Sequence, residues 1–430
     1  WRIRWRATLG ESVCDYGDKV TSFAVRGDDI YLLTHRASPR YSVVRTSLAA
    51  PDVKTAATVI APSEQVLFEI AAAKDGLYLE SRDGAVKRLK RLAWGSSTAT
   101  EVKMPLEGAT SIMSASPDIE GAVVSLAAWT RAREIYAVDA AGKAANTGLQ
   151  PLGPFDAPAG YVTVEVKVKS HDGAMVPLSI IHKKGVKLDG SNPALLYGYG
   201  SYGITEEPGY IARRLAWLEK GGVFAVANVR GSGVYGQDWY KGGYKATKPN
   251  TWKDFIACAE YLVAQKYTRP AKLGILGGSA GGILVGRAMT ERPDLFAAVI
   301  PAVGVMDAVR AETTANGIPN IPEFGTVKKE DEFRALLAMS SYHQVKDKAA
   351  YPAVLLIHGV NDPRVDVWHS SKFAARVLAA TTSGKPVLLD LEYDAGHGVG
   401  ATKSQRQRDT TDMYAFLLWQ TGHADFQPGK

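Results

Sequence analysis

The most informative segment of the chain is Ile275-Leu276-Gly277-Gly278-Ser279-Ala280-Gly281-Gly282. Its apolar start is typical of a buried strand, and the residues from Ile283 onward favour a helix. A serine on a sharp strand-to-helix turn lies clear of the sheet, and glycine neighbours let the strand and the helix approach each other closely. A phosphate-binding turn is the alternative, but the lysine of that motif is absent. We therefore interpret Ser279 as a nucleophile.

Strand-like and helix-like segments alternate on both sides of this turn. The expected strands are residues 161–169, 176–182, 194–197, 223–229, 273–276, 297–303, 354–358 and 387–392. The expected helices are residues 211–220, 252–265, the segment after Ser279, 367–381 and 412–419. Repeated strand–helix–strand units predict a doubly wound, mostly parallel sheet with helices on both faces. Together with the serine turn, this pattern predicts the α/β class and the α/β-hydrolase fold.

A loose repeat occupies the earlier part of the chain. Segments 28–33, 75–80 and 120–125 resemble one another at intervals of 47 (from 28 to 75) and 45 (from 75 to 120), and each precedes a second short strand. Such units are typical of propeller blades, and a β-sandwich is the alternative. We predict a partial β-propeller of about three blades over residues 1–155. The α/β-hydrolase catalytic domain is expected over residues 156–430, after a proline-rich linker.

The number of predicted blades is small, because propellers usually have about four to eight. The chain also begins at Trp1 rather than at methionine. We therefore expect either further blades upstream of Trp1 or an open β layer. An open strand edge favours association, so these residues alone are expected to be poorly soluble, oligomeric or inactive compared with a protein that has the missing blades.

The composition is that of a globular protein, with 46% hydrophobic residues and a formal net charge of +7 over 430 residues. Basic and acidic residues are intermixed, which argues against a nucleic-acid partner. Cys14 and Cys258 have no metal-ligand spacing around them and fall in different expected domains, so neither a disulfide nor a zinc site is predicted. No apolar run reaches about 18 residues, which predicts a soluble protein without a membrane span. The compartment, cytoplasm or periplasm, and the oligomeric state stay open, and no cofactor or metal is expected.

A serine nucleophile needs a base and a third group that orients the base. In α/β-hydrolases these groups follow in the order serine, acid, histidine. The glycine-flanked loop 394–400 follows an expected strand and holds His397, the candidate base. His358 lies inside a strand and His369 opens a helix, so both are expected to be structural or surface residues.

Asp362 is the candidate acid, because it follows the 354–358 strand at the edge where ligands collect in open α/β sheets. Its competitors are Asp307, Asp366, Asp390 and Asp394. Asp307 lies one connection too early in the chain, and Asp366 begins an expected helix. Asp390 lies inside an expected strand, and Asp394 is too close to His397 in the sequence to approach it from another loop. Asp362 therefore completes the expected triad.

An oxyanion formed on the substrate needs two hydrogen-bond donors. One is expected to be the backbone N–H of Ala280, the residue after the nucleophile. The other is expected from the loop 197–203, which contains Tyr197, Tyr199 and Tyr202. The residues alone leave open which tyrosine donates and which only line the cleft.

Six short motifs occur in the order Tyr197-Gly198-Tyr199-Gly200, Ala227-Asn228-Val229-Arg230-Gly231, Gly277-Gly278-Ser279-Ala280-Gly281-Gly282, Arg292-Pro293-Asp294-Leu295-Phe296, Asn361-Asp362-Pro363-Arg364-Val365 and Ala395-Gly396-His397-Gly398. Together they resemble the prolyl oligopeptidase family of serine peptidases over about residues 160–420. The resemblance implies a seven-bladed propeller ahead of the hydrolase domain, acting as a lid that admits only short peptides.

The same resemblance implies roles for individual residues. Ser279, Asp362 and His397 correspond to the triad, and Tyr199 to the hydroxyl donor of the oxyanion hole. Arg364 corresponds to the residue that holds a substrate carbonyl. The specificity pocket corresponds to Tyr202, Val305, Phe324 and Val365, with Asn320 at the position where prolyl cleavers have a tryptophan.

The expected activity is therefore that of a serine oligopeptidase, which hydrolyses short peptides through an acyl-enzyme after proline or another small residue. Loss of the tryptophan is expected to weaken the proline preference by roughly tenfold to a few hundredfold. A preference for basic residues is an alternative, which the segment 320–324 disfavours because Glu323 is its one acidic residue. An esterase stays open as well, as does a propeller-based binding protein whose hydrolase half is inert.

Overall fold

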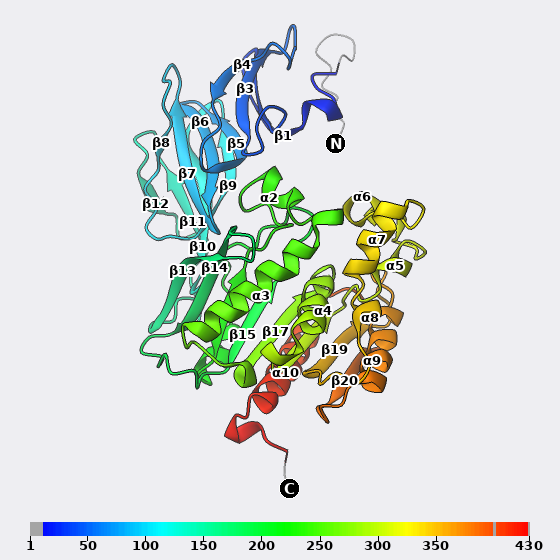
Figure 1. The fold of residues 1–430 in the computed structure, drawn as a ribbon. Helices are drawn as coiled ribbons and strands as arrows, with labels where there is room; N and C mark the ends of the chain where they lie inside the picture. Colours follow the sequence, from blue (N-terminus) through cyan, green and yellow to red (C-terminus); the bar gives the residue numbers. More distant parts are fainter. Residues whose placement is uncertain (1–11, 399–400, 429–430) are drawn as a thin grey trace. The chain divides into compact units, whose positions relative to one another are not determined.

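The computed structural model describes residues 12–398 and 401–428, and it divides into two compact units (Figure 1). The first unit holds the chain up to Ala159 together with the segments Glu207–Ile211 and Val234–Asp238. The second holds the remaining chain from Gly160 onward. The predicted change of domain lies between residues 155 and 156. Trp1, on which one of the expectations above was based, lies outside the described residues. Val399 and Gly400 of the predicted His397 loop also lie outside them.

The first unit contains three four-stranded antiparallel sheets. Their strands are β1 (Val20–Arg26), β2 (Asp29–Thr34), β3 (Ser42–Ser47) and β4 (Ala57–Ile60); β5 (Val66–Ala73), β6 (Gly76–Asp83), β7 (Val86–Ala93) and β8 (Thr100–Glu101); and β9 (Ala109–Ser116), β10 (Ile119–Ala128), β11 (Arg131–Val138) and β12 (Ala144–Asn146). The three repeated segments fall on β2, β6 and β10, the second strand of each sheet along the chain. The predicted three-blade propeller region is therefore confirmed.

Apolar faces of neighbouring sheets form the core of this unit. Leu33 of the first sheet shares one buried cluster with Leu77 and Leu79 of the second. Tyr78 of the second sheet shares another with Val124 of the third. Leu77, Leu79 and Tyr78 are on the same strand, so its alternating side chains enter different clusters. Each blade is thus stabilised by its neighbour.

The second unit is built on an eight-stranded sheet in the order β13-β14-β16-β15-β17-β18-β19-β20. The strands are β13 (Tyr161–Lys169), β14 (Met175–Lys183), β15 (Ala194–Gly198), β16 (Val223–Ala227), β17 (Leu273–Gly278), β18 (Ala298–Ala302), β19 (Ala353–Gly359) and β20 (Val387–Glu392). The first two form an antiparallel hairpin, β14 pairs antiparallel with β16, and the remaining pairs are parallel. This confirms the predicted hydrolase sheet.

Helices cover both faces of this sheet. They are α1 (Arg214–Glu219), α3 (Pro249–Ala264), α4 (Gly281–Glu291), α9 (Trp368–Ala380) and α10 (Lys403–Gln420). The remaining helices are α2 (Gln237–Lys241), α5 (Ala308–Ala311), α6 (Ile321–Phe324), α7 (Glu330–Met339) and α8 (Ser341–Gln344). In Figure 1, α3 and α4 lie in front of the sheet and α10 lies behind it. A ring contact of 5.6 Å between Trp217 and Tyr414 joins α1 to α10.

The last helix begins at Lys403, well before the predicted residue 412. The Thr402 hydroxyl accepts from the N–H of Gln405 at 3.2 Å, and the Gln405 amide oxygen accepts from the N–H of Thr402 at 2.8 Å. This reciprocal pair is a capping box, which fixes the start of a helix. The predicted start was wrong because the apolar residues begin only in the later turns of α10.

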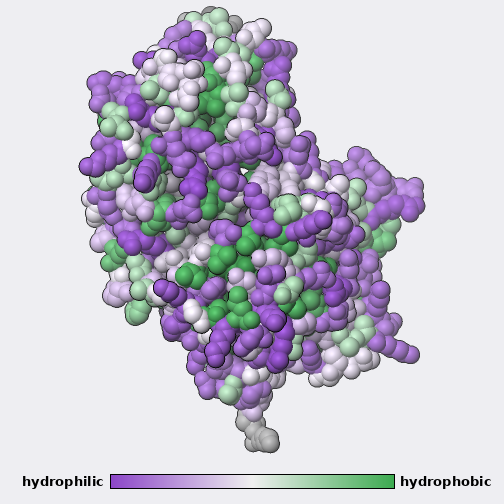
Figure 2. Space-filling model, turned by 60° about the vertical axis from the view of Figure 1, so that its left-hand side comes forward, coloured by the Kyte–Doolittle hydropathy of each residue, from purple (hydrophilic) through white to green (hydrophobic). Residues whose placement is uncertain are grey.

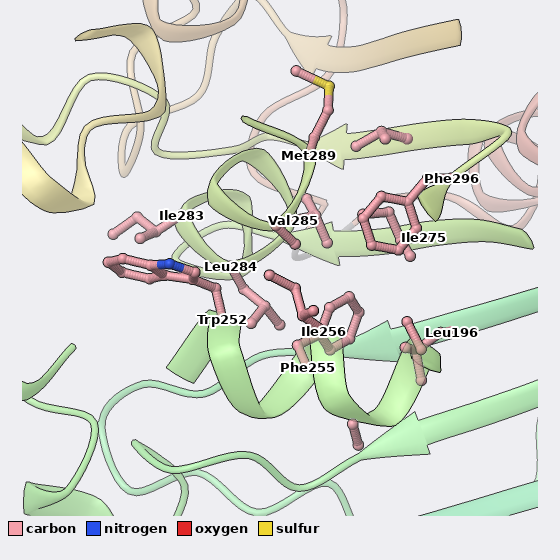
Figure 3. Close-up of a cluster of buried hydrophobic side chains, with 14 of the residues drawn as sticks. Leu196, Trp252, Phe255, Ile256, Ile275, Ile283, Leu284, Val285, Met289 and Phe296 are labelled. Carbon is pink, nitrogen blue, oxygen red and sulfur yellow. The ribbon is translucent and has the colours of Figure 1, made fainter. Parts of the chain in front are cut away.

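The core between α3, α4 and the sheet positions the strand ends that matter for function (Figure 3). Trp252 and Phe255 of α3 face Leu284 of α4, and all three are at most 2% exposed. A side chain at Gly198, the end of β15, would place its Cβ 2.8 Å from Leu284 and 2.9 Å from Phe255. Burying one such side chain contributes about 1.5–3 kcal/mol, so the turns after β15 and β17 lie on a rigid base.

The surface is mixed in character. The face shown in Figure 2 is mainly hydrophilic, with smaller groups of hydrophobic side chains between the polar ones. In the described ranges, no helix combines the length and the apolar content needed to cross a membrane.

Candidate active site

Ser279 lies on the turn between β17 and α4 with a φ of +56°. A side chain in this left-handed region costs roughly 1–2 kcal/mol, so the turn must be held by its surroundings. The Ser279 N–H donates to the Ala302 carbonyl at 2.9 Å, and the Ser279 carbonyl accepts from the Val305 N–H at 2.9 Å. A Cβ at Gly282 would lie 2.6 Å from the Cα of Gly304, so glycine is required for the close approach.

Asp362 and His397 meet at the carboxyl edge of the same sheet. Asp362 follows β19, His397 follows β20, and the His397 Nδ1 lies 2.6 Å from the Asp362 Oδ2. The other carboxylate oxygen of Asp362 accepts from the backbone N–H of Arg364 at 2.8 Å and of Val365 at 3.0 Å. Asp362 is thus oriented by its own loop, and His397 presents Nε2 as the ring nitrogen not engaged with the acid.

The loop that carries His397 packs against the loop that carries Asp362. The Asn361 N–H donates to the Ala395 carbonyl at 3.1 Å, and the Asn361 side-chain amide donates to the Tyr393 carbonyl at 2.6 Å. A Cβ at Gly359 would lie 2.3 Å from the carbonyl oxygen of Gly396. These contacts fix the distance between the candidate acid and the candidate base.

His358 is a structural residue with a direct relation to Asp362. It is fully buried, its Nδ1 lies 2.7 Å from the Ser370 hydroxyl and its Nε2 lies 2.8 Å from the Val365 carbonyl. The same Nε2 lies 3.4 Å from the Asp362 Oδ2. Burial opposes ionisation of Asp362, but hydrogen bonds from His358, His397 and the two backbone N–H groups outweigh it, so the pKa of this carboxyl is well below its usual range. Asp362 is therefore a carboxylate at neutral pH.

The three tyrosines of the loop after β15 have different partners. The Tyr197 hydroxyl lies 3.4 Å from a Glu206 oxygen, and the Tyr202 hydroxyl donates to the Asn320 side chain at 2.8 Å. Burial raises the pKa of Tyr199, and its hydrogen bond with the Ser279 side chain opposes this shift. Tyr199 is therefore a neutral hydroxyl next to the serine. Ala280 is the N-cap residue of α4, where backbone N–H groups have no partner within the helix.

The residues assigned to the pocket gather near these groups. The ring of Tyr202 meets the ring of Phe324 edge-on, with centroids 5.5 Å apart. The Val305 N–H donates to the Ser279 carbonyl, and the Val365 N–H donates to the Asp362 carboxylate. Phe324 and Val365 are both 6% exposed, which makes this wall of the site apolar.

Arg364 is exposed, and its positive charge acts to lower the pKa of Tyr199. The Arg364 carbonyl accepts from the Asn316 amide at 3.1 Å. Arg364 thus contributes an exposed positive charge that acts on this tyrosine.

A buried network behind this pocket was not predicted from the sequence. The Glu323 carboxylate is 4% exposed and accepts from the Tyr202 N–H at 2.8 Å and from the Tyr240 hydroxyl. Lys248, 1% exposed, donates to the Gly200 carbonyl at 2.5 Å. No local motif marks Lys248, because its partners are about 50 and 75 residues away in the sequence; the one available signal was a lysine directly before the Pro249 that begins α3.

A second buried network supports the loop after β16. Arg230 donates from its Nε to Asp254 at 2.9 Å and from a terminal nitrogen to Asp172 at 2.5 Å. Asp254 is fully buried and also accepts from the Ser170 hydroxyl at 2.5 Å. Bidentate pairs of this kind fix geometry. A Cβ at Gly231 would lie 2.0 Å from the Gly200 carbonyl oxygen, so the residue after Arg230 packs directly against the loop that carries the tyrosines.

The competing acid Asp307 has a different environment. Its carboxylate bonds the Lys372 ammonium and lies 3.6 Å from the His343 Nδ1. The Asp307 N–H donates to the Nδ1 of His369, whose ring stacks on Trp368 at 3.9 Å. His369 is 2% exposed and is therefore a core residue. Of the two roles expected for it, structural or surface, the structure supports the structural one.

Comparisons with known proteins identify the family to which this chain is similar. Residues 210–424 match the prolyl oligopeptidase family, Peptidase_S9. The chain is 32% identical to a prolyl endopeptidase of Elizabethkingia meningoseptica over 397 residues, which cover 92% of this chain and 56% of the relative. It is 30% identical over 438 residues to the dual function macrocyclase-peptidase POPB of Galerina marginata, covering 98% of this chain and 58% of the relative.

A solved structure from a mechanistic study of two prolyl endopeptidases superposes with a TM-score of 0.87 at 35% identity, covering 94% of this chain and 59% of that one. The chain thus spans just over half the length of the relatives that it matches. Sequence similarity and fold point to the same family. The chain belongs to the prolyl oligopeptidase family.

Proposed function

We propose that the protein is a serine peptidase that hydrolyses short peptides through an acyl-enzyme. The hydrogen bond of 2.6 Å between His397 and Asp362, on the same sheet edge as the strained Ser279 turn, is the observation that carries this proposal. An acid that holds a histidine by Nδ1 fixes its tautomer, which leaves Nε2 as the acceptor for a serine proton. Serine, acid and histidine also follow in the order expected for the fold.

In the proposed first step, the Ser279 hydroxyl attacks the substrate carbonyl while His397 takes its proton. The carbonyl oxygen becomes an oxyanion, which the Tyr199 hydroxyl and the Ala280 N–H stabilise. His397 then protonates the leaving amine, and the peptide bond breaks. Water, activated by the same histidine, releases the acyl group and restores Ser279. Asp362 stays ionised throughout, since its donors favour the carboxylate.

We propose that the residue before the cleaved bond lies in the pocket of Tyr202, Val305, Asn320, Phe324 and Val365, and that Arg364 binds a substrate carbonyl. The apolar wall of Phe324 and Val365 supports a small apolar side chain, proline or alanine. Glu323 is already engaged by Tyr202, Tyr240 and Lys248, so its carboxylate is compensated and unsuited to receive a basic side chain.

A matched set of chromogenic peptides tests this proposal. The peptides differ only in the residue before the cut, which is proline, alanine, leucine or arginine, and an ester of the alanine peptide is included. We expect amide hydrolysis with kcat/KM highest for proline and alanine. Hydrolysis of the ester alone would identify an esterase, and a preference for arginine would overturn the proposed pocket.

A further inference from the structure

The ammonium group of Lys248 is held inside the second unit, next to the loop that carries Tyr199. Its Nζ donates to the Gly200 carbonyl at 2.5 Å and to the Ser201 hydroxyl at 2.6 Å. These are the two residues that follow Tyr199 in the chain. Hydrogen bonds from a charged donor are stronger than those between neutral groups, so this single side chain restrains the backbone beside the candidate oxyanion donor.

The same ammonium faces the Glu323 carboxylate at 4.0 Å and the Phe324 ring at 5.6 Å. Glu323 in turn accepts from the Tyr202 N–H at 2.8 Å. Burial lowers the pKa of Lys248 to about 8, while the attraction of Glu323 opposes this shift. Lys248 therefore links three consecutive residues of the tyrosine loop, two directly and one through Glu323, to the helix that carries Phe324.

We propose that Lys248 is a positioning residue, which holds the Tyr199 hydroxyl where it can donate to the oxyanion that forms at Ser279. The inference rests on the proposed serine chemistry, but it assigns a role to a residue outside the triad, the oxyanion donors and the pocket wall. A displacement of about 1 Å at such a donor costs up to about 10²-fold in rate. Loss of the ammonium therefore acts on catalysis although Lys248 does not touch the substrate.

The test uses phosphonylation of Ser279 by a fluorophosphonate, which needs no knowledge of the natural peptide. In this reaction the Ser279 hydroxyl gives its proton to His397 and its oxygen forms a bond to phosphorus, while the P–F bond breaks and fluoride leaves. The phosphoryl oxygen occupies the oxyanion site. Lys248→Met keeps an unbranched side chain but removes the terminal nitrogen with its charge and hydrogen bonds, and we expect labelling to slow by roughly 10- to 10²-fold. Lys253→Met, on the same helix α3, is the matched control and should label within about twofold of the unsubstituted protein.

A double-mutant cycle with Tyr199→Phe distinguishes positioning from general support of the fold. If Lys248 acts through the Tyr199 hydroxyl, Lys248→Met adds little once that hydroxyl is gone, so the double variant should label about as slowly as Tyr199→Phe alone. Rate losses that multiply across the two substitutions would overturn the proposal.

A compensated variant guards against loss of the fold, because Lys248→Met leaves the buried Glu323 carboxylate without its cation. Lys248→Met/Glu323→Gln removes both charges and keeps an oxygen acceptor for the Tyr202 N–H. We expect it to melt near the unsubstituted protein and to label slowly. If both Lys248 variants are unfolded at the assay temperature, Lys248 supports the fold and the positioning role is wrong. If the unsubstituted protein is not labelled, the proposed function itself fails; if Lys248→Met labels at the full rate, only this inference fails.

Discussion

Two buried aspartates follow neighbouring strands of the sheet, and each has a histidine beside it. Asp362, after β19, bonds the Nδ1 of His397 through its carboxylate. Asp307, after β18, uses its carboxylate to bind the Lys372 ammonium and lies 3.6 Å from the His343 Nδ1, whereas its hydrogen bond with His369 is made by its backbone N–H. The first pair can stabilise a protonated histidine, whereas the second holds a neutral ring whose Nδ1 lone pair is occupied. An acid close to a histidine is therefore not enough for catalysis; the remaining partners of the carboxylate decide its role.

The largest expected effect separates these two acids directly. Asp362→Asn should reduce kcat by about 10⁴-fold, because an amide no longer selects the tautomer of His397 or stabilises its charged form. Asp307→Asn should leave kcat within about threefold, and should lower the free energy of unfolding by about 1–3 kcal/mol, because Lys372 loses its partner. Steady-state kinetics of both variants measure kcat, and chemical denaturation measures their free energies of unfolding. Equal loss of activity in the two would break the comparison.

The next effect concerns the tyrosines of the loop after β15. Tyr199→Phe keeps the ring and removes one donor, so kcat should fall by roughly 10- to 10³-fold with little change in KM. Tyr197→Phe is the matched control, because its hydroxyl faces Glu206 rather than Ser279. A loss confined to KM in Tyr199→Phe would mean that this residue only lines the cleft.

These outcomes bear on what the sequence could predict. Ser279, Asp362 and His397 could be predicted from the sequence, because each lies on a loop directly after a recognisable strand and is located by local patterns. The role of Lys248 and the contact of His358 with Asp362 could not be predicted from the sequence, since both depend on residues brought together by folding. The helices between β18 and β19, such as α7 (Glu330–Met339), were missed as well; the acidic first turn at residues 330–332 was the available signal.

A smaller effect is expected in the pH dependence of stability, and it concerns the second histidine. Burial lowers the pKa of His369 to about 4 from its ordinary 6.5, so the unfolded chain binds this proton more readily than the folded one. Stability therefore falls as the pH drops from about 6.5 towards 4, by about 2 kcal/mol between pH 7 and pH 5 from this group alone. His369→Gln should flatten that part of the profile, as followed by the unfolding midpoint. An unchanged slope in the variant would mean that another group titrates there.

The smallest effect is expected in the proposed specificity pocket. Asn320 bonds the Tyr202 hydroxyl, and in the proposed pocket it stands where a flat ring would stack on proline. Asn320→Trp should raise the kcat/KM ratio for proline over alanine peptides by about 2- to 10-fold, since aromatic contacts add about 0.5–1.5 kcal/mol. Ile318→Trp, at a side chain 71% exposed on the helical turn that precedes α6, serves as a control for adding a ring to this loop. An unchanged ratio would show that position 320 does not face the substrate.

The most direct measurement is mass spectrometric mapping of the protein after treatment with a fluorophosphonate, with Ser279→Ala treated in parallel. We expect one adduct, on the peptide that contains Ser279, and none in Ser279→Ala, together with a loss of peptide hydrolysis of about 10⁴- to 10⁶-fold in that variant. Removing a single hydroxyl should leave the melting temperature nearly unchanged. An adduct on another serine, or hydrolysis of peptides by Ser279→Ala above the background rate, would contradict the assignment of Ser279 as the nucleophile.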